Sequence, residues 1–350
     1  MEHDGPDQIV TFYSYQGGTG RTMAVANIAW ILAASGKNVL TVDWDLAAPG
    51  MHRFLEPFLD AGSVMRNSGV VDILREFEDR IVHDAGFADE KVRRLAVVDH
   101  HTTTLEWSFP GSGRLSLLSA GRQNANYSPM LGEGQWSRFF DELNGADFLE
   151  NLRDSMRASY DYTLIDCRAG RSDMVDMCTQ HLPDVLVACY GMSGRSIDGA
   201  VQAAHAVEAV ARPGGSGGAI RVLPLAMQVD DRYKARAEAG RRLAEQAFAG
   251  WPRGMTDAER HNYFASVEIP YRGDYAFEEM LAIFGDTPGD PRSLLAAYER
   301  LTDVITSGRV SSLPPMSLDD RLRVLPQFDR SARLKQAKAQ DARRYRHDLS

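Results

Sequence analysis

Short apolar runs alternate with longer segments of helical periodicity over most of the chain. The short runs are rich in β-branched and aromatic residues, which is typical of buried strands, whereas the longer segments carry apolar residues at helical spacing. Strands that alternate with helices in this way predict a parallel sheet covered on both faces, a three-layer αβα sandwich. The predicted strands are 9–13, 39–42, 114–121, 160–166, 182–190, 220–227 and 266–271, with a possible strand at 105–107. The clearest helices are 23–34, 148–159, 234–248 and 294–306. Further helices are expected at 81–99 and 136–143, with a loop at 124–134 and a glycine-rich link at 213–218.

A glycine-rich turn, SYQGGTGRT at residues 14–22, separates the first strand from the first helix. Glycines let backbone N–H groups converge on an anion, and the following helix directs the positive end of its dipole to the same point. The turn departs from the pattern G-x-x-x-x-G-K-[ST], with Tyr15 for the first glycine and Arg21 for the lysine. Arg21 still brings a cation to the phosphates and Thr22 a hydroxyl to Mg²⁺. The alternative is a tight turn without ligand; a dinucleotide-binding turn fits less well because a third glycine is missing.

Carboxylates follow two of the predicted strands where ligands bind in open α/β sheets. Asp43 and Asp45 end the strand at 39–42, and Asp166 ends the strand at 160–166. Arg168 and Gly170 lie two and four residues after Asp166, in a turn suited to sensing a γ-phosphate. The sequence therefore predicts that acidic groups and the glycine-rich turn share one edge of the sheet.

These three motifs, in this order, resemble the MinD/ParA-type P-loop ATPases with a deviant Walker A motif (SIMIBI class). The similarity covers about residues 8–307, and the turn is similar to the branch whose loop reads KGGVGR, where arginine replaces lysine. The resemblance implies ATP and Mg²⁺ as cofactors and a regulatory role in bacterial signalling, conflict or peptide-modification systems. The nucleotide-binding positions that it implies are Gly17, Gly18, Thr19, Gly20, Arg21, Thr22 and Met23 in the loop, with Gln228, Pro270 and Tyr271 as candidates for the base, beside Met227 and Arg272.

The resemblance also implies roles in catalysis and metal binding. Thr22, Asp43 and Asp166 are expected to hold or support Mg²⁺, and Asp45 to position or activate the attacking water. Arg21 and Arg168 are expected to neutralise charge on the phosphates, since phosphoryl transfer depends on positioning and charge more than on covalent help.

One departure concerns the residue that opens the loop. In the family a lysine there reaches the phosphates of a partner subunit, whereas this chain has Gln16. Arg168, Arg171 or Arg195 can replace the missing charge, as arginine fingers do elsewhere, or can be surface arginines in ordinary ion pairs.

The domain organisation predicted is an ATPase domain at 1–307 and a basic tail at 308–350, with a helix at 328–345. The long stretch between Asp45 and Asp166 predicts an insertion around 81–144. The insertion and the tail are the expected sites for a protein partner, beside a nucleotide-dependent homodimer.

Composition limits the partners further. A formal net charge of −9 over 350 residues disfavours broad binding to nucleic acid or anionic lipid, so nucleic acid is possible but not indicated. The acidic N-terminus without an apolar core and the absence of a long apolar run predict a cytoplasmic protein without a membrane span. Three cysteines at no metal-ligand spacing predict reduced thiols.

Three functions are compatible with these motifs. The first is an ATP-binding, slowly hydrolysing switch that controls dimerisation or partner binding. The second is a nucleotide sensor with negligible hydrolysis, suggested by Gln16 and Arg21. The third is a metabolic ATP-dependent ligase or kinase, for which no substrate-binding constellation is evident.

Overall fold

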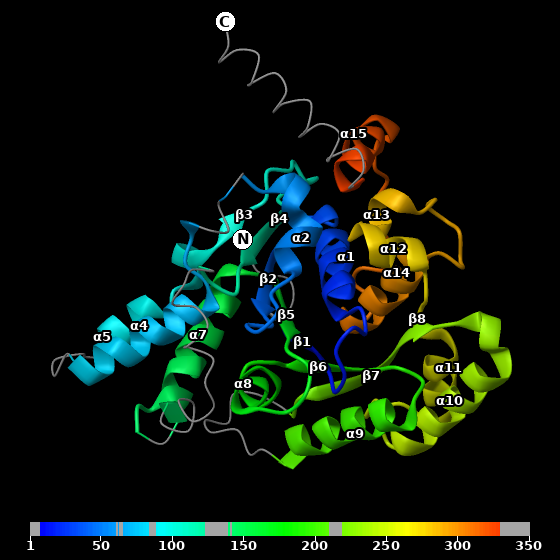
Figure 1. The fold of residues 1–350 in the computed structure, drawn as a ribbon, viewed down its shortest axis with the longest axis horizontal. Coiled ribbons are helices and arrows are strands. Elements are labelled where there is room, and N and C mark those ends of the chain that lie inside the picture. The colour runs from blue at the N-terminus through cyan, green and yellow to red at the C-terminus, as the bar shows by residue number, and fades with distance from the viewer. Residues whose placement is uncertain are drawn as a thin grey trace, which may run out of the picture.

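The computed structural model shows one eight-stranded sheet in the order β3-β4-β2-β5-β1-β6-β7-β8 (Figure 1). It describes residues 8–60, 62, 66–83, 89–122, 139–140, 142–209 and 219–329. All neighbouring strands pair in parallel except β3 and β4, which are antiparallel. The strands are β1 Gln8–Ser14, β2 Asn38–Trp44, β3 Thr103–Thr104, β4 Arg114–Leu118, β5 Tyr162–Cys167, β6 Val185–Tyr190, β7 Arg221–Val229 and β8 Glu268–Pro270.

Helices cover both faces of the sheet, which confirms the predicted αβα sandwich. One apolar cluster lies between the sheet and helices that include α1, α13 and α14, and a second lies between the sheet and α4, α7 and α8. The helices are α1 Arg21–Ala34, α2 Met51–Leu55, α4 Val70–His83, α5 Asp89–Leu95, α7 Gly145–Ser159, α8 Asp173–Asp176, α9 Gly194–Ala209, α10 Lys234–Ala247, α11 Asp257–Ser266, α12 Gly273–Glu278, α13 Ala282–Gly285, α14 Leu294–Ile305 and α15 Leu318–Phe328.

Alternation along β1 shows why both faces are covered. Val10 and Phe12 belong to the first cluster, whereas Ile9 and Tyr13 belong to the second. Strands that are apolar on both faces are buried when helices pack on each side. β1 is therefore buried between the two apolar clusters, and the glycine-rich turn begins at the end of this buried strand.

Between β2 and β4 the structure differs from the prediction. The helix expected at 81–99 overlaps the end of α4, at His83, and α5, which ends at Leu95 and so stops short of the predicted end; residues 84–88 lie outside the described residues. The strand expected at 105–107 is wrong: the strand that pairs with β4 is Thr103–Thr104, and Leu105 adds one N–H bond to the Leu115 carbonyl at 2.9 Å. The predicted loop at 124–134, half of the helix predicted at 136–143 and the glycine-rich link at 213–218 lie outside the described residues.

The first part of the predicted tail packs on the core. α15 buries Val324 and Phe328 in the first cluster, and the Phe328 ring lies 6.0 Å from that of Phe284. The described residues after 307 are therefore not a detached appendage. The rest of the tail, including most of the predicted helix at 328–345, lies outside the described residues.

The cysteines correct one expectation. Cys167, at the end of β5, and Cys178, after α8, are joined in a disulfide with their Cα atoms 6.4 Å apart. The turn that follows β5 brings the chain back to the strand, a proximity that the sequence spacing did not indicate. Cys189 is buried and free. None of the helices in the described part of the chain combines the length and apolar character needed to cross a membrane.

Candidate functional site

The glycine-rich turn links the end of β1 to the start of α1. Gly18 and Gly20 have φ angles of 72° and 89°, a left-handed conformation that residues with a Cβ rarely adopt. The Ser14 hydroxyl donates to the Gln16 carbonyl at 2.6 Å, and the Thr19 hydroxyl donates to Ser14 Oγ at 3.2 Å. These hydrogen bonds stabilise the turn. Because α1 begins at Arg21, its N-terminal N–H groups face the turn.

Thr22 and Asp166 meet across the sheet. The Thr22 hydroxyl donates to Asp166 Oδ2 at 2.5 Å, although the residues are 144 positions apart. β5 places Asp166 beside β1, with Asp166 opposite Phe12 in register, and Asp166 is 1% exposed. The hydroxyl predicted to serve Mg²⁺ and the carboxylate predicted to help it therefore share one site.

Arg21 lies against the same acidic group. Its NH2 is 3.5 Å from Asp45 Oδ2, and its Nε is 3.8 Å from Asp166 Oδ1. The side chain is 6% exposed, and its NH1 forms no hydrogen bond. Arg21 therefore contacts both Asp45 and Asp166, and all three residues were expected from the sequence to act in catalysis. Its position against the carboxylates was not predicted.

Asp43 is the neighbour of Asp166 in the sheet, because β2 and β5 pair these residues in register. Asp43 Oδ2 accepts hydrogen bonds from the Gly50 and Met51 N–H groups at 3.0 and 3.1 Å, which fixes the loop after β2. Burial, and next the charge of Asp166, raise the pKa of Asp43 well above its usual range. Burial also raises the pKa of Asp166 to about 6, against the opposing effects of Arg21 and Thr22. Two such buried carboxyl groups side by side favour a cation between or near them.

The donor set fits Mg²⁺. Asp43 Oδ1 and Asp166 Oδ1 are buried oxygens without a hydrogen-bond donor, and Thr22 adds a hydroxyl. Mg²⁺ in phosphate-binding sites takes only one or two protein ligands and completes its shell with water and phosphate oxygens. Accordingly, no group of three or more His, Cys, Asp or Glu side chains suited to a metal occurs in the described ranges.

The turn after Asp166 is tied to the end of β1. The Tyr13 hydroxyl donates to the Gly170 carbonyl at 2.9 Å, and the Gly170 N–H donates to the Ser14 carbonyl at 3.3 Å. Arg168 and Arg171 are exposed in this turn and make no ion pair with a described residue. Arg168 is therefore close to Asp166 in the sequence, but in the structure it does not contact Asp45 or Asp166.

The proposed base-binding residues divide into two groups. Gln228, near the end of β7, donates from Nε2 to the Gly18 carbonyl at 2.9 Å and so contacts the glycine-rich turn at 14–22, called the P-loop below. Pro270 ends β8, which pairs with β7, and Tyr271 follows it at 37% exposed. These two residues lie along the sheet from Gln228, with no described hydrogen bond to the P-loop.

A further P-loop contact was missed from the sequence. Tyr15 packs on Gly199 of α9 so closely that a Cβ on Gly199 would lie 2.2 Å from Tyr15 Cγ. The Arg195 guanidinium lies over the Tyr15 ring, 5.8 Å from its centroid. Two features of the sequence indicated this contact: Tyr15 replaces the loop's first glycine, and Gly199 lies within a helix. The two residues are far apart in the sequence.

Comparison with known proteins finds sequence relatives over about half of the chain. No protein-family model matches the chain. It is 26% identical over 196 residues to an uncharacterised ATP-binding protein of Methanocaldococcus jannaschii (55% of this chain, 57% of that protein) and 26% identical over 182 residues to the septum site-determining protein MinD of Helicobacter pylori (51% of each). The chain thus spans about half the length of the curated relatives it matches.

Solved structures extend the similarity to the whole fold. Apo McdA of Cyanothece superposes with a TM-score of 0.55 at 14% identity, over 85% of this chain and 99% of that one. A ParA family ATPase of Chlorobium tepidum gives 0.52 at 16% identity, over 85% and 98%. This is the MinD/ParA-type P-loop ATPase fold. In this fold the glycine-rich turn follows β1, and Asp43, Asp45 and Asp166 lie at the carboxyl ends of β2 and β5.

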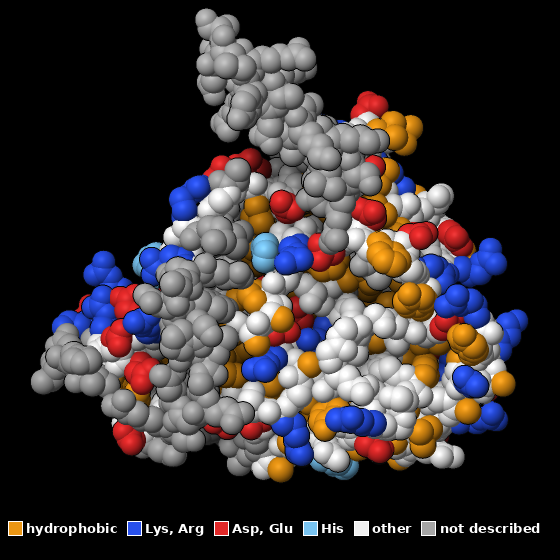
Figure 2. All heavy atoms as spheres, in the orientation of Figure 1, with side chains coloured by type: hydrophobic (Ala, Val, Ile, Leu, Met, Phe, Trp, Pro, Cys, Tyr) orange, Lys and Arg blue, Asp and Glu red, His pale blue; other side chains and the backbone are white. Residues whose placement is uncertain are grey.

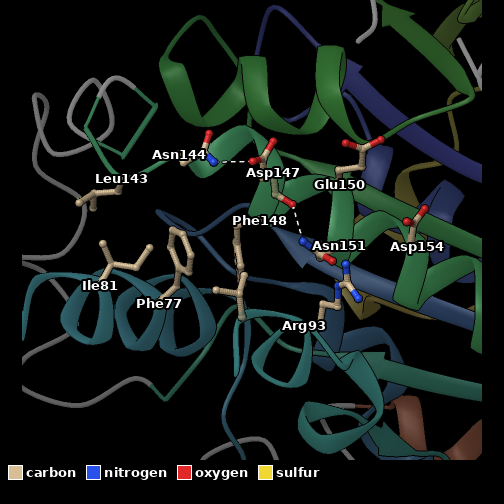
Figure 3. Close-up of a pocket in the computed structure, with 11 residues that line it drawn as sticks. Phe77, Ile81, Arg93, Leu143, Asn144, Asp147, Phe148, Glu150, Asn151 and Asp154 are labelled. Atoms are coloured by element: carbon tan, nitrogen blue, oxygen red, sulfur yellow. Dashed lines mark hydrogen bonds between the residues drawn. The ribbon is translucent and has the colours of Figure 1, made fainter. Parts of the chain in front are cut away.

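A separate cavity of about 410 Å³ lies between α4, α5 and α7 (Figure 3). The stacked rings of Phe77 and Phe148, 4.2 Å apart, form part of its apolar lining, and α7 contributes Asp147, Glu150 and Asp154. None of its lining residues belongs to the P-loop or to the acids after β2 and β5. It is therefore distinct from the glycine-rich turn and its neighbouring acids, and it lies partly in the predicted insertion.

Proposed function

We propose that this protein is an ATP-binding, slowly hydrolysing P-loop ATPase whose nucleotide state controls dimerisation or partner binding. The hydrogen bond between Thr22 and Asp166 carries the proposal, because it joins the P-loop to the buried acidic group at the carboxyl edge of the sheet. Two relatives of known fold support the cofactors: one is a MinD described as complexed with Mg-ADP, the other an McdA variant complexed with ATP.

In this proposal each residue has a separate task. The backbone from Gly17 to Arg21, followed by Met23, binds the phosphates. Thr22 and Asp166, supported by Asp43, hold Mg²⁺, which neutralises phosphate charge when bound. Asp45 orients the attacking water, and Gln228, Pro270 and Tyr271 form the base side.

Arg21 has to exchange partners for this chemistry. Its guanidinium pairs with Asp45 and Asp166, and the same group is the one expected to meet the phosphates. An arginine can serve both purposes because its planar fork donates in several directions. Release of Asp45 from Arg21 would leave that carboxylate free to accept a proton from water.

Dimerisation in this chain has to use a cation other than the lysine that opens the loop in the family. Gln16 is neutral and cannot act as the lysine of the family does. Arg195, held over Tyr15 beside Gln16, and the exposed Arg168 and Arg171 are the cations that can supply the charge. The predicted insertion and the tail are the proposed partner sites.

Nucleic acid is a weaker candidate partner. One related structure is a ParA bound to nonspecific DNA. On the face drawn in Figure 2, however, basic and acidic side chains are interspersed over the described surface, which does not form a continuous basic stripe there. Such a stripe is the usual electrostatic footprint of nucleic-acid binding.

Phosphate release and molecular mass, measured with ATP, ADP and no nucleotide and with DNA added in parallel, test the proposal. Slow release with a doubling of mass in ATP supports it, and no ATP binding contradicts it. Asp45→Ala should abolish turnover while it spares ATP binding; unaltered hydrolysis in this variant would exclude the role given to Asp45.

A second candidate, a sensor without useful hydrolysis, is favoured by the pairing of Arg21 with both carboxylates and by Gln16. It predicts tight ATP binding and negligible phosphate release from the wild-type protein. A ligase or kinase would instead show turnover only with an added substrate, so the same measurements separate all three.

A further inference from the structure

β7 carries a bulge where it meets the P-loop. Ala226 pairs with Glu268 and Val229 with Pro270, so β7 has one more residue than β8 between the two pairs. Gln228 lies in this bulge with a φ angle of 53°, in the left-handed region. Bulges turn side chains in new directions and are frequent beside active sites. Here the bulge belongs to a strand end that faces the P-loop.

The bulge directs Gln228 to one atom of that loop. Gln228 Nε2 donates to the Gly18 carbonyl at 2.9 Å, across 210 residues of sequence. The approach is close: a Cβ on Gly20 would lie 3.7 Å from Gln228 Nε2 and 3.6 Å from Met227 Cε. Both residues of the bulge therefore border the turn that binds phosphate.

We infer that Gln228 is a positioning residue that holds the Gly18–Thr19 peptide in its phosphate-binding orientation, an inference that rests on the proposed function. In a trans peptide the carbonyl oxygen and the next N–H point in opposite directions. Fixing the Gly18 oxygen on Gln228 therefore fixes the direction of the Thr19 N–H. A phosphate cradle needs converging N–H groups, and a carbonyl turned inward would repel the anion.

The backbone of Gln228 supports the same role. A left-handed conformation is unfavourable for a residue with a long side chain and is found where surrounding structure and function maintain it. If the bulge were only a feature of the sheet, asparagine or glycine would serve it better, since both adopt this conformation more readily. Asparagine, however, is one methylene too short to reach Gly18.

This difference gives the experiment. Gln228→Asn and Gln228→Gly are compared with wild type by calorimetric titration with Mg-ADP and by hydrogen exchange of residues 14–22 without nucleotide. We expect five- to tenfold weaker ADP binding, the usual effect of one lost hydrogen bond, and faster exchange at Thr19. Thermal unfolding of both variants should stay at or above the wild-type midpoint.

Gln327→Asn is the matched control. Gln327 Nε2 also donates to a backbone carbonyl, that of Arg323 at 3.2 Å, but on α15. Wild-type ADP affinity and exchange in both Gln228 variants would overturn the inference. If the wild-type protein itself binds no ADP, the proposed function fails, and the exchange of Thr19 still decides the role of Gln228.

Discussion

The guanidinium of Arg21 lies 3.5 Å from the carboxylate of Asp45, inside the protein and at the start of the P-loop helix. Arg21 is 6% exposed and Asp45 18% exposed, so solvent screens their attraction less than at the surface. The pair joins the residue expected to meet phosphate to the residue expected to meet water. Its contribution to stability and its effect on nucleotide binding can be measured separately.

Arg21→Met should destabilise the nucleotide-free protein by about 3 kcal/mol, because it leaves buried carboxylates without their cation. Urea unfolding measures the loss. Arg232→Met is the control: Arg232 pairs with Asp230, but its side chain is 74% exposed, so the change should stay within about 0.5 kcal/mol. Equal losses in the two variants would contradict a special role for the buried pair.

Asp166→Asn should stabilise the nucleotide-free protein at neutral pH. The folded-state pKa of about 6 exceeds the ordinary aspartate value of 3.8, so the wild-type carboxyl favours the folded state below pH 4 and loses that contribution as pH rises through 6. The loss amounts to roughly 3 kcal/mol by pH 7, and asparagine does not undergo it. The free energy of unfolding of both proteins from pH 4 to 7 tests this.

Stabilisation by Mg-ADP tests the second role of Asp166, in the metal site. A bound cation favours the ionised carboxylate, so Mg-ADP should raise the unfolding temperature of the wild-type protein and raise that of Asp166→Asn much less. Equal stabilisation of the two proteins would show that Asp166 does not contribute to the metal site.

Gly199→Ala should disturb the P-loop through Tyr15. The added Cβ would lie 2.2 Å from Tyr15 Cγ, so the variant should lose about 1–3 kcal/mol of stability and bind Mg-ADP more weakly. Tyr15→Ala in the same chain removes the clash, and the double variant should recover ADP affinity relative to Gly199→Ala. A double-mutant cycle in urea measures the coupling, and additive effects would exclude the contact.

Gln16→Lys should increase phosphate release and promote an ATP-dependent dimer if the missing lysine limits turnover. Cations that meet a transferring phosphate are worth large factors in rate, so a gain of about tenfold or more is expected. Gln16→Met, neutral and of similar length, is the control and should behave as wild type. No gain with lysine would mean that another cation, such as Arg195, already fills that role or that the chain is a sensor.

Much of the fold and of the acidic site was predictable because each signal is local. Apolar runs marked the central strands, glycines marked the turn after β1, and Asp43, Asp45 and Asp166 stand at strand ends. Parallel pairing then brings such ends to one edge regardless of sequence distance. The meeting of Thr22 with Asp166 follows from topology once the strand order is known.

The contacts that were not predicted depend on three-dimensional proximity without a local pattern. Gln228 reaches Gly18 only because a bulge turns it, and Tyr15 fits only because Gly199 lies opposite. The Cys167–Cys178 disulfide likewise depends on how the turn after β5 returns to the strand. In each case the residue type was visible in the sequence, but its partner was not.

Helix α1 limits where the movement of the proposed nucleotide switch can occur. Of its residues, only Thr22 and Met23 are not buried, and the rest are enclosed by the sheet and by neighbouring helices. A helix packed on every side cannot shift without opening the core. If the proposed switch operates, the ATP and ADP states are expected to differ in the loops around a stationary α1, and a partner that distinguishes them should contact those loops rather than the helix.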